Sequence, residues 1–403
     1  MDKIDRIFDS FVNNNLFKNK AVLQSNYNPE TITHRDEQIE SIASILAPAL
    51  RGERISNLFV YGKTGTGKTL SVKHVGDKVT SRLKEMGENN LQFVYVNCKL
   101  KKVADTEYRI LAEIIHTLGG SVPATGLPTD QVYARFIDLI DNKKQMIILV
   151  LDEIDQAVKK ISDNFIYSLT RLNTELKNAQ ISIIGISNSL TFMDGLDPRV
   201  RSSLGEEEMV FSPYNALQLQ DILKERSEKA FKSEILEEGV IAKCAAYAAR
   251  EHGDARRALD LLRVAGEIAE RGNSKKITLQ HIDFANNKIE RDKMLDIIEG
   301  EPRQFQLVLY SIMSISEDSN KRKEGIFTGE VYNAYQELCS KTRNEALTQR
   351  RVSDILAEFD MLGIINTHVI SKGRHGRMRE IKLMLASNIK IKAREILEKS
   401  IYT

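Results

Sequence analysis

The sequence predicts an α/β domain with a parallel sheet flanked by helices, then an all-α domain, then a small domain of three helices and a β-hairpin. Up to about residue 212, short apolar runs alternate with helical patterns, as in buried parallel sheets. From 213 to 299, Ala, Leu, Glu, Lys and Arg dominate at helical spacing. From 300 to 403, three helical patterns precede two strand-like runs, the order of a winged helix. We therefore expect domains at 1–212, 213–299 and 300–403.

A glycine-rich loop follows the first apolar run, Leu58–Tyr61, and leads into a helical pattern. It reads G-K-T-G-T-G-K-T and matches the phosphate-binding P-loop, G-x-x-x-x-G-K-[ST], in the strand–loop–helix context that this loop requires. Lys68 is expected to reach the β- and γ-phosphates, and the Thr69 hydroxyl to hold Mg²⁺. The expected cofactor-binding residues are Gly62, Lys63, Thr64, Gly65, Thr66, Gly67, Lys68, Thr69 and Leu70.

The rest of the first domain continues the alternation. We expect strands at 92–98, 181–186 and 210–211, and helices at 1–20, 34–50, 70–86, 106–118 and 131–141. Residues 22–33 are polar and predict a loop. The charged group 34–37 is either a solvated first turn of its helix or lies near a bound nucleotide base. The segment 119–128 holds two of the seven prolines and predicts a turn cluster.

Two carboxylates end the most apolar run of the chain. Six apolar residues from Met146 lead straight into Asp152 and Glu153, so both lie at the carboxyl end of a buried parallel strand, where ligands bind in open α/β sheets. Asp152 is expected to hold Mg²⁺ through water, and Glu153 to polarise an attacking water. The pair could instead be a helix N-cap and a first-turn charge. Asn188 ends the next strand and is either a turn residue or a second group that orients this water.

The helical domain offers a cation for the same site. Breaks are expected near Ser233, Gly253 and Gly272, and the stretch G-D-A-R-R-A-L after the second break opens a helix. An arginine in the first turns of that helix can approach a γ-phosphate. We assign Arg256 to this role, with Arg257 as the alternative, because adjacent helical positions point about 100° apart. The other interpretation is a solvated basic helix.

The last domain carries two basic groups suited to DNA. We expect helices at 302–316, 328–341, 348–362 and 389–400, and a hairpin of 364–370 and 379–385. Thr348 is an N-cap candidate, so that the first turn of the third helix presents polar and basic side chains where recognition helices contact bases. The hairpin tip is basic and suits phosphate or a minor groove, although a solvated loop or a domain used only for protein contacts is also open. The expected DNA-binding residues are Gln349, Arg350, Arg351, Lys372, Arg374, His375, Arg377 and Arg379.

Composition sets the broad class of protein. Charged residues make up 28% and apolar residues 42%, as in ordinary globular proteins, and the net charge is only +2. The sequence has no apolar run of about 18 residues, so no membrane partner is expected. The three cysteines are far apart, which favours a reducing cytosol and argues against structural zinc. We expect a cytoplasmic protein.

The motifs G-K-T-G-T-G-K-T, L-V-L-D-E-I-D, I-S-N and G-D-A-R-R-A-L, in this order and followed by a winged helix, together resemble the AAA+ initiator ATPases. They most resemble the archaeal origin-recognition proteins of the Orc/Cdc type, over essentially the whole chain. The resemblance implies a Walker A Lys68 and Thr69, a Walker B Asp152 and Glu153, a sensor 1 Asn188 and a sensor 2 Arg256. It also implies an AAA+ fold with a helical lid and a winged helix.

The resemblance carries functional expectations. It implies binding of ATP or ADP with Mg²⁺, recognition of duplex origin DNA, loading of a replicative helicase, association with the nucleoid and contact with other initiator protomers. Residues 119–131 fall where the family inserts a helix into the minor groove. They contain no Lys or Arg, so we expect backbone or apolar DNA contacts there.

One departure lowers the expected turnover. Many AAA+ relatives donate an arginine finger from a Ser-Arg pair, but here Ser203 stands at the arginine position, with Arg199 and Arg201 as remaining candidates. We therefore expect slow hydrolysis, with the nucleotide acting as a switch. The alternatives are an ATP-dependent transcription regulator, a helicase loader that acts mainly through protein contacts, and a P-loop binding module without meaningful turnover.

Overall fold

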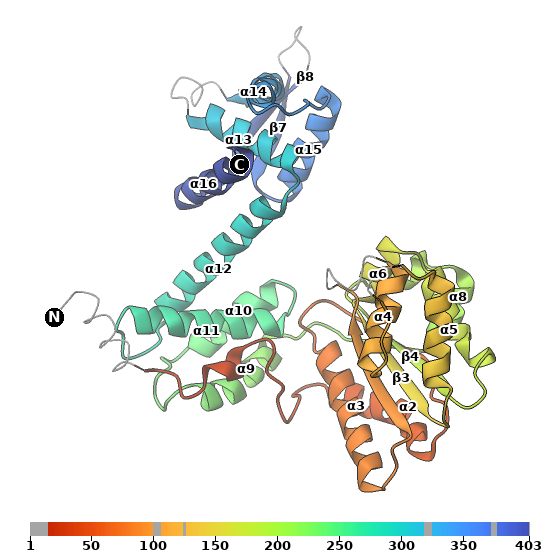
Figure 1. Cartoon of the computed structure of the whole chain (residues 1–403). Coiled ribbons are helices and arrows are strands. Elements are labelled where there is room, and N and C mark those ends of the chain that lie inside the picture. Colours follow the sequence, from red (N-terminus) through yellow and green to blue (C-terminus); the bar gives the residue numbers. More distant parts are fainter. Residues whose placement is uncertain (1–14, 100–105, 124–125, 318–324, 372–376, 403) are drawn as a thin grey trace, which may run out of the picture. The chain divides into compact units, whose positions relative to one another are not determined.

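The computed structural model describes residues 15–99, 106–123, 126–317, 325–371 and 377–402 (Figure 1). The chain divides into two compact units, Met1–Ala285 and Asn286–Thr403. The helix α12, Leu279–Gly300, contains the division point. No helix of the described residues is long and apolar enough to cross a membrane.

A five-stranded parallel sheet forms the centre of the first unit, in the order β2-β3-β4-β1-β5. Four strands lie where the sequence predicts them, within one or two residues. The fifth was expected at 210–211 and instead covers 207–210, because its exposed glutamates hide the strand pattern of an edge strand. The strands are β1 Leu58–Tyr61, β2 Leu91–Asn97, β3 Met146–Asp152, β4 Gln180–Ser187 and β5 Glu207–Val210.

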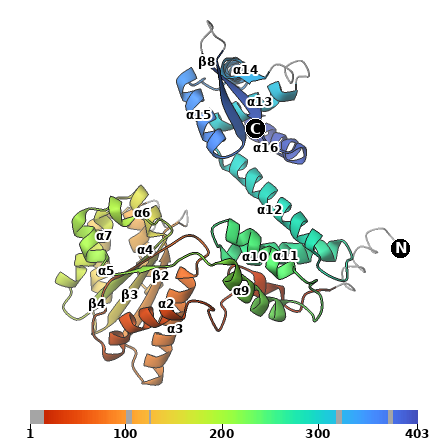
Figure 2. The same cartoon turned by 180° about the vertical axis from the view of Figure 1, so that it is seen from behind.

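Helices cover both faces of this sheet (Figures 1 and 2). Successive residues of β3 alternate between two cores, as the pleat of a strand requires: Ile147 and Leu149 enter one core, and Ile148 and Val150 enter the other. The core of Ile148 contains α2 Asp36–Leu46 and α3 Lys68–Glu85. The core of Ile147 contains α4 Glu107–Thr117, α5 Thr129–Ile140, α6 Ile154–Lys160, α7 Asn164–Arg171 and α8 Pro198–Leu204.

Short 3-10 helices complete this part of the chain. They are η1 Lys20–Leu23, η2 Ala47–Arg51, η3 Leu172–Thr174 and η4 Met193–Gly195. The helix expected at 34–50 is therefore α2 continued by η2, because Pro48 falls near the start of the second segment.

The helical lid consists of α9 Ala216–Ala230, α10 Val240–Arg250, α11 Ala255–Arg271 and the first residues of α12. These helices end close to Ser233, Gly253 and Gly272, which confirms the three breaks that the sequence predicts. Each helix contributes small or branched apolar residues to its inner side, and Ala258, Leu261 and Leu262 of α11 are buried. The lid belongs to the same compact unit as the sheet.

The chain before the sheet packs on the lid, which the sequence did not reveal. The backbone N–H groups of Lys18 and Asn19 donate to the carbonyl of Ala230. The Phe17 ring lies 4.7 Å from that of Phe231. The expected helix at 1–20 is wrong for residues 15–19, which are not helical, and its remaining positions Ile4, Ile7, Phe8, Phe11 and Val12 lie outside the described residues.

The second unit is a winged helix. The helices α13 Arg303–Glu317, α14 Thr328–Lys341 and α15 Gln349–Met361 precede the hairpin of β7 Ile365–Ser371 and β8 Arg377–Leu383, and α16 Ser387–Tyr402 follows. These elements confirm the predicted order. A further strand, β6 Ile326–Phe327, pairs antiparallel with β8. Its two residues are too few to show a periodic pattern in the sequence.

Candidate functional site

A cavity of about 410 Å³ lies between the P-loop, the carboxyl ends of the strands and the lid. Its volume is in the range of sites for small ligands. Three of the expected cofactor-binding residues, Gly62, Lys63 and Thr64, are described by the structure but do not line this cavity. The expected site residues that do line it are Gly65, Thr66, Gly67, Lys68, Thr69, Leu70, Asp152, Glu153, Asn188 and Arg256.

The P-loop has the conformation that a phosphate site needs. Gly67 has φ of 93° and is the N-cap of α3, so the loop turns sharply, and the first residues of the helix, Lys68, Thr69 and Leu70, line the cavity as in anion sites at helix N-termini. Gly65 has φ of 73°, and a Cβ placed there would collide with the carboxylate of Asp254 in the lid. Both positions therefore require glycine.

Lys68 is buried at 5% exposure, and its Nζ has three acceptors. It donates to the carbonyls of Gly62 at 2.7 Å and Lys63 at 2.8 Å, and to Oδ1 of Asn188 at 2.9 Å. Burial lowers the pKa of Lys68 to about 8, and the negative charge of Asp152 opposes this shift. Gly62 and Lys63 thus contribute to the site through their carbonyl groups.

Thr69 and Asp152 form the expected metal-binding pair. The Thr69 hydroxyl donates to Oδ2 of Asp152 at 2.8 Å, which leaves the hydroxyl lone pairs free for a cation. Hydroxyl and carboxylate oxygens are the donors that Mg²⁺ prefers. Among the described residues, no three His, Cys, Asp or Glu side chains form a metal cluster. A donor set of the Thr69 hydroxyl and the Asp152 carboxylate fits Mg²⁺ that also takes ligands from phosphates and water.

Glu153 has an unusual backbone conformation at the end of β3. Its φ is 54°, in the left-handed region, which costs a non-glycine residue about 1 kcal/mol or more. It occupies the N-cap position of α6, as the alternative interpretation expects, but among the described residues its side chain makes no capping hydrogen bond. Its Oε1 accepts from Nδ2 of Asn188 at 3.3 Å. The amide of Asn188 therefore lies between Lys68 and Glu153.

The lid brings Arg256 rather than Arg257 to the cavity. Arg256 lines it, whereas Nε of Arg257 lies 3.2 Å from the carboxylate of Glu251. Asp254 caps α11 by accepting from the N–H groups of both arginines. The N–H of Ala255 donates to the carbonyl of Gly65 at 3.2 Å, so the start of α11 touches the P-loop directly.

Sequence reasoning missed one wall of the cavity. The predicted loop 22–33 supplies Tyr27, Pro29 and several polar residues to the lining. The guanidinium of Arg226, from α9, lies 4.6 Å from the centroid of the Tyr27 ring and also lines the cavity. The aromatic and proline residues in an otherwise polar stretch were the signal that could have revealed this wall.

Arg35 links the P-loop to the segment that leads from β5 to the lid. It is buried at 4% exposure, and its Nε donates to the carbonyl of Thr66 at 2.9 Å. A second nitrogen donates to the carbonyl of Ser212 at 2.5 Å, and the guanidinium stacks 3.9 Å from the centroid of the Tyr214 ring. The interpretation of 34–37 as a solvated turn is therefore wrong for Arg35.

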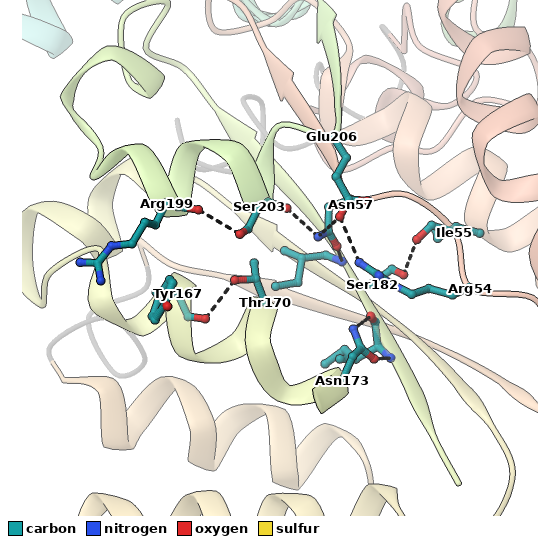
Figure 3. Close-up of polar contacts among 12 residues, drawn as sticks. Arg54, Ile55, Asn57, Tyr167, Thr170, Asn173, Ser182, Arg199, Ser203 and Glu206 are labelled. Carbon is teal, nitrogen blue, oxygen red and sulfur yellow. Dashed lines mark hydrogen bonds and ion pairs between the residues drawn. The ribbon is translucent and has the colours of Figure 1, made fainter. Parts of the chain in front are cut away.

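The region expected to hold an arginine finger is polar and internally bonded (Figure 3). The Ser203 hydroxyl donates to the carbonyl of Arg199 at 2.9 Å, and its own carbonyl accepts from Nδ2 of Asn57 at 2.7 Å. Arg199 pairs with Asp197 at 3.0 Å, and Arg201 lies 3.5 Å from Asp194. Both arginines are exposed and each already has a carboxylate partner.

The expected DNA-binding residues lie in the second unit. Thr348 caps α15 by accepting from the N–H of Arg351, so Gln349 and Arg350 lie exposed in the first turn. Nη1 of Arg351 lies 3.8 Å from Asp354. Two further positions, Arg377 and Arg379, belong to β8, whereas Lys372, Arg374 and His375 lie outside the described residues.

Comparison with known proteins covers all three domains. Residues 53–193 match the family described as AAA domain, 220–287 the Cdc6 AAA+ ATPase-type lid domain, and 296–393 the CDC6 C-terminal winged helix domain. The ORC1-type DNA replication protein of Pyrococcus furiosus is 52% identical over 390 residues, which cover 96% of this chain and 91% of that protein. This chain belongs to the ORC1-type DNA replication protein family.

Other ORC1-type proteins agree with this assignment. The ORC1-type DNA replication protein 1 of Methanosarcina mazei is 49% identical over 383 residues, which cover 94% of this chain and 91% of that protein. The solved structure of the Aeropyrum pernix ORC1 protein in complex with DNA is 42% identical and has a TM-score of 0.82. It covers 95% of this chain and 97% of that one. The AAA+, lid and winged-helix folds are thus those of the ORC1-type family.

Proposed function

We propose that this ORC1-type protein is a DNA replication initiator that binds ATP or ADP and recognises duplex origin DNA. One observation carries the proposal: Lys68, Thr69, Asp152, Asn188 and Arg256 line a single cavity in a chain that also has a winged helix. Family membership, and the DNA bound to the A. pernix ORC1 protein, support the DNA half. The proposed domain limits are 1–212, 213–299 and 300–403.

In the nucleotide half of the proposal, each residue of the cavity has its own role. The P-loop N–H groups and Lys68 bind the phosphates, and Thr69 and Asp152 hold Mg²⁺. When bound, Mg²⁺ neutralises phosphate charge. Glu153 polarises the attacking water, Asn188 orients it, and Arg256 reaches the γ-phosphate from the lid. The carboxylate partners of Arg199 and Arg201 support slow turnover, so that the nucleotide acts chiefly as a switch.

In the DNA half, Gln349 and Arg350 read base edges, since glutamine suits adenine and arginine suits guanine. Arg351, Arg377 and Arg379, with Lys372, Arg374 and His375 of the wing, bind phosphate or a minor groove. Residues 119–131 add backbone or apolar contacts. Helicase loading, contact with further protomers and association with the nucleoid in the cytoplasm belong to the same proposal.

Nucleotide binding is tested by Lys68→Ala in the full-length protein. We expect loss of detectable ADP and ATP binding, because the variant removes the cation that faces the phosphates. Lys78→Ala, an exposed position further along α3, is the control and should bind normally. Tight binding by Lys68→Ala would refute the P-loop assignment.

Initiation is tested by footprinting on total genomic DNA. Protection at one or a few loci with repeated sequences supports an initiator. Protection spread over promoters would instead support a transcription regulator. Protein that protects no DNA, yet binds a helicase, would favour a loader that acts through protein contacts.

A further inference from the structure

Tyr95 of β2 reaches the carboxylate that is expected to hold the metal. Its hydroxyl donates to Oδ2 of Asp152 at 2.6 Å. In the parallel pairing of β2 with β3, Tyr95 is opposite Val150 and Asn97 is opposite Asp152. Because side chains alternate along a strand, Tyr95 and Asp152 project from the same face, towards α3.

The carboxylate of Asp152 has three donors from different parts of the fold. Oδ2 accepts from both Thr69 of α3 and Tyr95 of β2, and Oδ1 accepts from the backbone N–H of Glu153 at 2.9 Å. Thr69 is the other expected metal ligand. The hydroxyls of Tyr95 and Thr69 therefore donate to the same carboxylate oxygen, and Thr69 is the side chain expected to lie beside the cation.

The surroundings of Tyr95 fix its role as a donor. It lines the cavity, and Nζ of Lys73 lies 3.4 Å from the centroid of its ring. A phenol carries an O–H donor and an ionised carboxylate only accepts, so the Tyr95 hydroxyl donates to Asp152.

We propose that Tyr95 is a positioning residue of the Mg²⁺ site. Its hydrogen bond holds the Asp152 carboxylate in the orientation in which Thr69 also donates to it. The inference rests on the proposed nucleotide function. Mg²⁺ demands near-ideal octahedral geometry, so a ligand that can rotate binds it less well. Removing an outer partner of a metal ligand typically weakens metal binding about 10- to 100-fold.

The test is Tyr95→Phe, which keeps the ring against Lys73 and removes only the hydroxyl. The matched control is Tyr133→Phe, because the Tyr133 hydroxyl also donates to a carboxylate, that of Glu107, at 2.7 Å, away from the cavity lining. Binding of a fluorescent ADP to the full-length proteins is measured in EDTA and across a Mg²⁺ titration. Mn²⁺ binding in the presence of ADP is followed by electron paramagnetic resonance.

For Tyr95→Phe we expect a roughly tenfold higher Mg²⁺ concentration at half-maximal effect, with the same shift for Mn²⁺. The control should match the wild type. Superimposable metal titrations, with or without a lower melting temperature, would show a purely structural tyrosine and overturn the inference. Failure of the wild type itself to bind ADP would instead refute the proposed function.

Discussion

The amide oxygen of Asn188 lies 2.9 Å from Nζ of Lys68, and the amide nitrogen of the same side chain lies 3.3 Å from the carboxylate of Glu153. Because an ammonium only donates and a carboxylate only accepts, these two partners determine which way the amide points. The end of β4 thus joins the P-loop cation to the carboxylate at the end of β3. Because the Asn188 side chain bonds to both groups, a movement of Lys68 or of Glu153 changes the hydrogen bonding of Asn188.

Nucleotide affinity should fall as pH rises above about 8. Phosphate binds the charged form of Lys68, and burial lowers the pKa of this lysine to about 8. Below this pH the lysine enters the complex already protonated. Above it a proton must be taken up, which weakens binding by up to about tenfold per pH unit. Titration of ADP binding from pH 7 to 9.5 checks the slope.

Lys68→Arg is the comparison, since arginine stays charged throughout this range. If Lys68→Arg retains ADP binding, its affinity for ADP should not change between pH 7 and 9.5. The effect on folding has the opposite sign: between pH 8 and 10.5 the unfolded chain holds more protons at this lysine, so its contribution to the free energy of unfolding rises with pH. A wild-type affinity independent of pH would contradict the lowered pKa.

Glu153→Gln should retain ATP and lose turnover. The amide preserves the size of the side chain near Asn188 but cannot polarise water, and removal of a general base typically costs about 10²- to 10⁴-fold in rate. Single-turnover hydrolysis and filter retention of labelled ATP measure the two properties separately. Glu175→Gln, an exposed position in the same domain, is the control. Unaltered hydrolysis in Glu153→Gln would remove Glu153 from its role.

Arg35→Met should destabilise the first unit by about 3 kcal/mol or more, because each hydrogen bond from a charged donor contributes about 1.5–3 kcal/mol and two carbonyls lose their partner. The stacked contact with Tyr214 is lost as well. Urea unfolding of the full-length protein measures the change. Arg54→Met removes an exposed ion pair with Glu206 and should cost at most about 1 kcal/mol. Equal effects of the two variants would show that Arg35 has no special structural role.

Arg374→Ala combined with Arg377→Ala should weaken DNA binding and reduce its salt dependence. Each lost phosphate contact lowers the slope of log K against log salt concentration by about 0.9. Lys275→Ala combined with Lys276→Ala removes two exposed charges from the lid and serves as the control. An unchanged slope in the arginine variant would mean that the wing does not touch DNA.

Elements that depend on residues close together in the chain could be predicted from the sequence. The run Met146–Asp152 is apolar at every position before its carboxylate, and the structure buries the whole strand. Glycine spacing around Lys68 specified the P-loop because its backbone conformation depends on residues within a few positions of one another. The lid helices ended where Gly or polar breaks were expected. The match of Asp152, Glu153 and Asn188 to one cavity followed because the carboxyl ends of parallel strands meet at one edge of the sheet. Arg256 reaches the same cavity from helix α11 of the lid.

Other features depend on contacts between distant residues, which leave no periodic signal. The burial of Arg35 requires Thr66 and Ser212, and the hydrogen bond of Tyr95 requires the neighbouring strand to bring Asp152 beside it. Residues 24–33 form no helix or strand, so only contacts with the lid, such as the hydrogen bond from Thr33 to Glu225, make them a wall of the cavity. By itself, then, the sequence determined the three domains, the P-loop and the acidic strand end, because hydrophobic period and glycine spacing are local. The tertiary structure decided which buried polar groups hold that site together, because their partners meet only when the chain folds.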